Sequence, residues 1–141
     1  MIEKSGSAVW SGGLKAGSGT VSTESGALDG IAYSHASRFE GKAGCNPEEL
    51  IGAAHAACYA MFLSALMEGA GIKPGTIATT STVTLDATTE GGPTVVAAHL
   101  VATVTGDAPE EKLLELAEQA KAGCPISKLL RAEVTLEVSV G

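Results

Sequence analysis

The last segment of the chain, residues 133–140, alternates strictly between apolar and polar side chains. Val134, Leu136, Val138 and Val140 fall on one face, and the polar residues between them fall on the other. Successive side chains of a β-strand point to opposite faces of its sheet. The pattern therefore predicts a strand with one face against a core and one face in water.

Earlier segments also have the character of strands. Residues 76–88 and 94–105 are rich in Thr and Val, and a Gly-Gly-Pro sequence stands between them. Because β-branched residues favour strands and Gly and Pro favour turns, these segments predict a hairpin. Shorter candidates at residues 7–11, 19–25 and 31–39 alternate with glycine-rich turns, which predicts an antiparallel meander near the N-terminus.

A long helix is predicted from Pro47 to about Gly69. Asn46 supplies an N-cap side chain, Pro47 suits the first helical position, and Glu49 stands three residues after the cap. The uncharged part, residues 50–67, reaches the lower length limit of a membrane span. His55 interrupts it and acidic residues flank it, without the basic residues common at the ends of spans. We therefore expect a helix buried on most sides of a soluble protein, with no membrane partner.

A second helix is predicted from Pro109 to Gly123, with Asp107 as its N-cap. Its buried face would consist of Leu113, Leu116, Ala117 and Ala120. Pro125 then opens a short helical turn capped by Cys124. The order is a strand meander, a long helix, a hairpin, a second helix and a C-terminal strand. This order lacks a regular βαβ repeat, so we predict the α+β class and a single domain over residues 1–141.

Charge and composition exclude some functions. The chain carries nine Lys and Arg against sixteen Asp and Glu, a formal charge of -7, and has no basic cluster. Nucleic acid is therefore an unexpected partner, because phosphate binding needs concentrated positive charge. The first residues lack the apolar region of a signal peptide, so we expect a cytoplasmic protein.

Three cysteines, Cys45, Cys58 and Cys124, are an odd number without a C-x-x-C pair, which argues against a secreted disulfide framework. Each cysteine is either an unreactive side chain that packs in the core or a thiol that takes part in a reaction. Cys58 would need a neighbouring cation or hydrogen-bond donors to become a thiolate, and the nearest candidates are His55 and Arg38. Cys124 precedes a helix N-terminus, which itself favours a thiolate, so local physics makes Cys124 the more acidic thiol.

Arg38 and Glu48 flank a glycine-rich loop and could form an ordinary surface ion pair. Glu48 stands ten residues before Cys58 on the predicted helix, about 15 Å along its axis. If both residues belong to one site, a second copy of the helix must cross the first. The small residues that permit such a crossing are Gly52, Ala56 and Ala60, although packing on the protein's own sheet explains them equally well.

Three segments together are similar to one family. SRFEG at 37–41, NPEELIGAAHAAC at 46–58 and AGCPISKLL at 122–130 resemble the OsmC/Ohr family of organic hydroperoxide reductases, and the likeness extends over nearly the whole chain. The histidine at position 55 resembles the OsmC branch. Cys45 departs from the family pattern, which usually has Thr there, and its role stays open between a polar substitute, an off-pathway disulfide and an effect on substrate entry.

The resemblance implies a thiol peroxidase that uses no metal and no bound organic cofactor. Cys58 matches the family's peroxidatic cysteine, although dipole reasoning favoured Cys124, and Cys124 matches the resolving cysteine. Arg38 and Glu48 match the pair that polarises the site. The resemblance also implies an intertwined homodimer, an organic hydroperoxide substrate and an external dithiol reductant of the lipoyl type.

One alternative function from a different class uses the same residues. A metal-binding or redox-sensing module would combine His55 and Cys58, one helical turn apart, with Cys45 or Cys124. The usual paired-ligand spacing is missing from the sequence, which favours the peroxidase.

Overall fold

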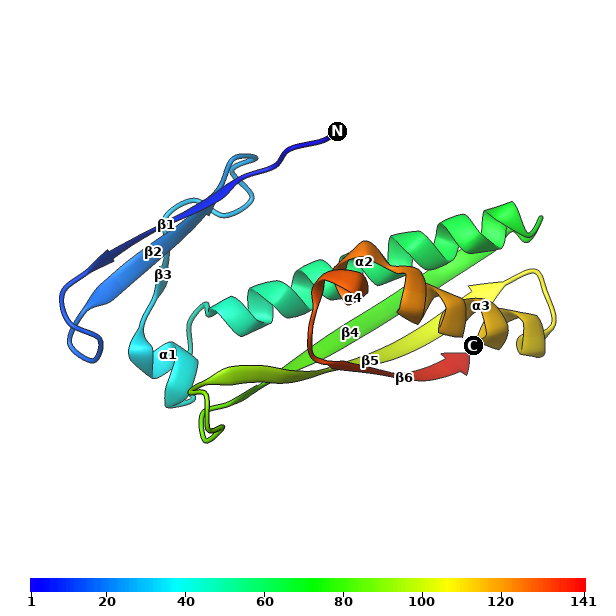
Figure 1. Cartoon of the computed structure of the whole chain (residues 1–141). Helices are drawn as coiled ribbons and strands as arrows, with labels where there is room; N and C mark the ends of the chain where they lie inside the picture. The colour runs from blue at the N-terminus through cyan, green and yellow to red at the C-terminus, as the bar shows by residue number, and fades with distance from the viewer. The chain divides into compact units, whose positions relative to one another are not determined.

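The computed structural model describes all 141 residues, which form two compact units, residues 1–50 and 51–141. Figure 1 labels the elements of both units. The α+β class is confirmed, and the predicted elements follow in the expected order with one additional short helix. The single domain over 1–141 stays a prediction.

The first unit contains the predicted antiparallel meander. Strands β1 (Gly6–Ser11), β2 (Ser18–Thr23) and β3 (Ile31–Tyr33) pair in sequence order. Gly19 on β2 lets the rings of Trp10 and Tyr33 approach, because a β-carbon there would lie 2.5 Å from the Tyr33 ring and 2.7 Å from the Trp10 ring. The ring centroids of that aromatic pair are 5.4 Å apart.

Residues 35–39 form a helix, α1 (His35–Phe39), where the sequence predicted the end of a strand. That prediction is wrong, and Ser34 explains why. The Ser37 N–H donates to the Ser34 hydroxyl at 3.1 Å, and the Ser34 N–H donates to the Ser37 hydroxyl at 3.0 Å. This capping box satisfies free N–H groups at the helix start and ends the strand at Tyr33.

The long helix α2 (Pro47–Gly69) has the predicted bounds, and the Asn46 side chain accepts the N–H of Glu49 at 2.9 Å. Only one face is buried within the chain, through Gly52, His55, Tyr59, Leu63 and Met67. Burial on most sides is therefore wrong for the single chain, because one sheet covers one face. The exposed residues of α2 include Ala53, Ala57, Met61 and Ala65. By length and composition alone, α2 is also apolar enough to cross a membrane.

The second unit is a three-stranded sheet in the order β4-β5-β6, with helices on one face (Figure 1). Strands β4 (Pro74–Asp86) and β5 (Thr94–Gly106) form the predicted antiparallel hairpin. Strand β6 (Glu133–Val140) keeps the predicted alternation and runs parallel to β5. Parallel strands need a crossover connection, and the helices α3 (Glu110–Gly123) and α4 (Pro125–Leu129) supply it.

The core of this unit lies between β5 and the helices. Leu100, Ala102 and Val104 of β5 are buried against α2 and α3. The predicted buried face of α3 is confirmed, but Asp107 as its cap is wrong. Pro109 occupies the N-cap position with an extended backbone (φ -57°, ψ 145°), so the helix begins at Glu110 and Asp107 stands too far upstream.

Candidate active site

Cys58 on α2 and Cys124 between α3 and α4 are brought together. Cys124 is fully buried, and the half-buried Cys58 packs against the same core. Pro125 is the local reason for this placement, because the residue before a proline avoids the helical conformation. Cys124 therefore ends α3 with an extended backbone and caps α4, as predicted. Its side chain lies within hydrogen-bonding reach of the Cys58 thiol.

The surroundings of Cys58 act on its ionisation in opposite directions. Burial raises the pKa of the Cys58 thiol, the Cys124 side chain raises it further, and the backbone N–H of Ile126 lowers it. Ile126 belongs to the first turn of α4, so the helix terminus that we expected to favour a thiolate at Cys124 donates to Cys58 instead. The net direction is upward, and a thiolate at Cys58 calls for an additional cation.

Cys58 opens onto an apolar hollow of about 280 Å³, lined also by Met61, Phe62, Ala65 and Pro125. Met61 is 80% exposed. Tyr59, by contrast, is fully buried and donates its hydroxyl to the Ala117 carbonyl at 3.2 Å.

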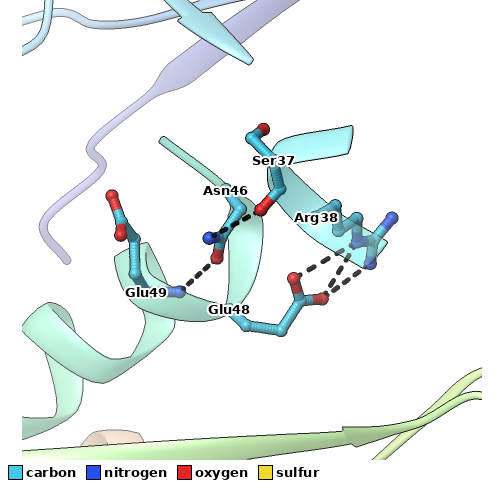
Figure 2. Close-up of polar contacts among 5 residues, drawn as sticks. All are labelled: Ser37, Arg38, Asn46, Glu48 and Glu49. Atoms are coloured by element: carbon cyan, nitrogen blue, oxygen red, sulfur yellow. Dashed lines mark hydrogen bonds and ion pairs between the residues drawn. The ribbon is translucent and has the colours of Figure 1, made fainter. Parts of the chain in front are cut away.

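Arg38 and Glu48 form a two-pronged ion pair, as Figure 2 shows. The Arg38 Nη2 lies 2.7 Å from Glu48 Oε1, and its Nε lies 3.1 and 3.2 Å from the two carboxylate oxygens. Two further bonds join the loop to both helices: the Asn46 amide donates to the Ser37 carbonyl at 3.4 Å, and the Glu49 N–H donates to the Asn46 side chain. Fork-to-fork geometry fixes the plane of the guanidinium group.

Cys45 is buried within residues 1–50 and bridges to Tyr33 by backbone pairing. The Ser37 hydroxyl donates to its carbonyl at 2.9 Å. Burial raises the pKa of the Cys45 thiol, and the nearby carboxylate of Glu49 raises it further. These contacts favour an inert thiol, while the other roles considered for Cys45 stay predictions.

His55 is fully buried between two serines that the sequence analysis did not identify. Its Nδ1 lies 2.8 Å from the hydroxyl of Ser81 on β4, and its Nε2 lies 2.8 Å from the hydroxyl of Ser127 on α4. Burial lowers the pKa of His55 below its ordinary value of 6.5, so the ring is neutral at neutral pH. Both ring nitrogens have partners, and no group of three or more His, Cys, Asp or Glu is arranged to hold a metal ion. The contacts do not support the alternative metal site.

Two free thiols lie close together here, and one of them opens onto an apolar hollow, which is the arrangement that a redox-active dithiol protein requires. A family model described as OsmC-like protein matches residues 39–139. The chain is 46% identical over 137 residues to peroxiredoxin OsmC of Escherichia coli K12, covering 96% of this chain and 95% of that protein.

Solved structures agree with this sequence match. The organic hydroperoxide resistance protein OhrB of Bacillus subtilis superposes with a TM-score of 0.71 at 26% identity, covering 97% of this chain and 98% of that chain. An OsmC organic hydroperoxide resistance protein of Legionella pneumophila superposes with a TM-score of 0.72 at 28% identity, covering 97% of this chain and 96% of that chain. The chain belongs to the OsmC-like family. Its predicted activity, that of a thiol-dependent peroxidase, is confirmed by these relatives.

Proposed function

We propose that this peroxidase reduces organic hydroperoxides to alcohols, with Cys58 as the attacking thiol and Cys124 as the resolving thiol. The observation that carries the assignment is the contact between the two side chains, of which only Cys58 opens onto the hollow. The apolar lining supports an organic substrate over hydrogen peroxide, because it removes the carbon chain of the substrate from water.

In the first step, the Cys58 thiolate attacks the terminal oxygen of the peroxide, and the O–O bond breaks. The alkoxide leaves and takes up a proton as an alcohol, while Cys58 becomes a sulfenic acid. In the second step, the Cys124 sulfur attacks the Cys58 sulfur, a disulfide forms and water leaves. An external dithiol, which we expect to be of the lipoyl type, then reduces the disulfide. No step requires a metal or a bound organic cofactor.

Arg38 is proposed to supply the cation that Cys58 needs. Its guanidinium group would stabilise the thiolate and donate a hydrogen bond to the peroxide, and Glu48 would hold the guanidinium in place. The two-pronged contact supports this division of roles, because it orients Arg38 while leaving donors for other partners.

A homodimer is proposed as the active form. Glu48 and Cys58 stand ten residues apart on α2, about 15 Å along its axis, so the ion pair of one copy would serve Cys58 of the other. The exposed apolar residues of α2, such as Ala57 and Met61, support an approach by a second copy. We also propose a cytoplasmic location, where thiols are kept reduced, and no nucleic-acid partner.

The roles of the two cysteines are tested by following peroxide consumption with a dithiol present. An organic hydroperoxide should be consumed faster than hydrogen peroxide. Cys58→Ser should abolish turnover, whereas Cys124→Ser should permit one rapid oxidation and then let Cys58 over-oxidise. Cys45→Ser is the matched control and should keep full turnover. A rapid first oxidation in Cys58→Ser, or its absence in Cys124→Ser, would overturn the assigned roles.

A further inference from the structure

The short helix that follows Cys124 is attached to α2 through two neighbouring contacts. The backbone N–H of Ile126 lies close enough to the Cys58 sulfur to lower the pKa of that thiol, and the Ser127 hydroxyl lies 2.8 Å from His55 Nε2. His55 and Cys58 are three residues apart, so both contacts lie on one turn of α2. The helix α4, which directly follows Cys124, is therefore held against the turn of α2 that contains Cys58.

This attachment matters because α4 has little stability of its own. The helix contains five residues, and isolated helices of that length do not form in water. Its internal backbone bonds are few, such as the Lys128 N–H to the Cys124 carbonyl at 3.0 Å. Its position must come from tertiary contacts, and the bond from Ser127 to His55 is buried, where a hydrogen bond is shielded from competing water.

His55 is itself fixed from the opposite side. The hydroxyl of Ser81 on β4 contacts Nδ1, so the ring is held between the sheet and α4. A neutral imidazole has one donor and one acceptor nitrogen, and a hydroxyl group matches either, so both bonds form in either tautomer. The ring thus connects α4 to the sheet.

We propose that His55 is a positioning residue that holds Cys124 within reach of Cys58 through its bond to Ser127, so that disulfide formation outpaces a second oxidation of Cys58. The inference rests on the proposed roles of the two cysteines. After the first peroxide, the Cys58 sulfenic acid has two fates: Cys124 attacks it and water leaves, or a second hydroperoxide oxidises it to a sulfinic acid and leaves as an alcohol. A fixed Cys124 favours the first fate, because a held neighbour reacts at a high effective concentration.

The test compares Ser127→Ala with the control Tyr59→Phe. Each variant removes one buried hydrogen bond made with α2. Ser127→Ala removes a bond between α2 and α4, whereas Tyr59→Phe removes a bond between α2 and α3. The measured quantity is the fraction of Cys58 converted to sulfinic acid per turnover, determined by mass spectrometry at several hydroperoxide concentrations. We expect Ser127→Ala to raise that fraction about fivefold, the size of one lost hydrogen bond, and Tyr59→Phe to leave it unchanged.

Two further variants separate positioning from general destabilisation. Ser127→Thr keeps a hydroxyl group and should restore the wild-type fraction. His55→Leu removes the other partner, and adding Ser127→Ala to it should cause no further rise, because the bond is already lost. Urea unfolding reports the stability of each variant independently.

The proposal is overturned if Ser127→Ala and the wild type over-oxidise equally, or if Tyr59→Phe raises the fraction as much as Ser127→Ala does. The failure of the underlying function looks different. In that case the wild type itself forms no disulfide between Cys58 and Cys124. The fraction of Cys58 converted to sulfinic acid then does not depend on a competition with disulfide formation.

Discussion

At Cys58, the acidity of one thiol is decided by groups from several parts of the chain. Burial and Cys124 raise its pKa, and a single backbone N–H from Ile126 opposes them. A net upward shift leaves little thiolate at neutral pH, whereas peroxide attack requires the thiolate. We therefore propose that Arg38 supplies the missing stabilisation, which makes this arginine the most informative residue to remove.

Arg38→Ala should slow the oxidation of Cys58 by an organic hydroperoxide about a hundredfold, the usual cost of removing one donor from a developing charge. The pH profile should move as well. Without the cation the pKa of Cys58 rises, so the rate of alkylation by iodoacetamide should reach its plateau at higher pH than in the wild type. Arg131→Ala is the control for the loss of one arginine. An unchanged pH profile in Arg38→Ala would contradict the assignment.

The residues of the site differ in how visible they are in the sequence. Cys58, Cys124, Arg38 and Glu48 stand in recognisable motifs, and the structure pairs them two by two. Ser81 and Ser127 were not identified, because they meet His55 from elements far apart in the chain. Serine is common on surfaces, and only tertiary packing distinguishes these two.

At the scale of elements, the close approach of α2 to β4 depends on a glycine. A β-carbon at Gly52 would lie 2.7 Å from the Ser81 carbonyl oxygen, which belongs to the backbone and cannot rotate away. Because Ser81 also holds His55, a shift of α2 here would disturb the neighbouring contacts of the site.

Gly52→Ala should therefore lower the free energy of unfolding by about 1 to 3 kcal/mol, despite the better helix propensity of alanine. Gly69→Ala, at the other end of the same helix, is the matched control, since nothing lies within 4 Å of its added β-carbon. Urea unfolding measures both. Equal stability of the two variants would show that α2 and β4 separate at little cost.

Elements with strong periodicity or strong caps were predicted well, and a short helix that depends on a few side-chain hydrogen bonds was not. Asn46 before α2 and Pro47 at its first position indicated where the helix begins, and the alternation of β6 indicated its two faces. The helix α1 depends on the reciprocal bonds of Ser34 and Ser37, which a short β-like sequence conceals. The exposure of one face of α2 could not be predicted either, because an apolar run looks the same whether the chain or a second copy covers it.

For the whole molecule, the proposed mechanism requires two chains for each active site. Mixing two inactive variants, Arg38→Ala and Cys58→Ser, tests this. After unfolding and refolding together, mixed dimers would pair the intact Arg38 of one chain with the intact Cys58 of the other. We expect peroxidase activity to return to about a quarter of the wild-type level, as random assortment gives one intact site in half of the dimers. Sites built within one chain would leave the mixture inactive.

We propose that a hydroperoxide oxidises Cys58 first and that Cys124 then attacks the oxidised sulfur of Cys58. The most direct measurement is peptide mapping by mass spectrometry after one equivalent of an organic hydroperoxide is added to the fully reduced protein. We expect one major product, in which the peptides containing Cys58 and Cys124 are joined by a disulfide and Cys45 keeps its thiol. A disulfide that includes Cys45, or an oxidised Cys124 beside an unmodified Cys58, would contradict it.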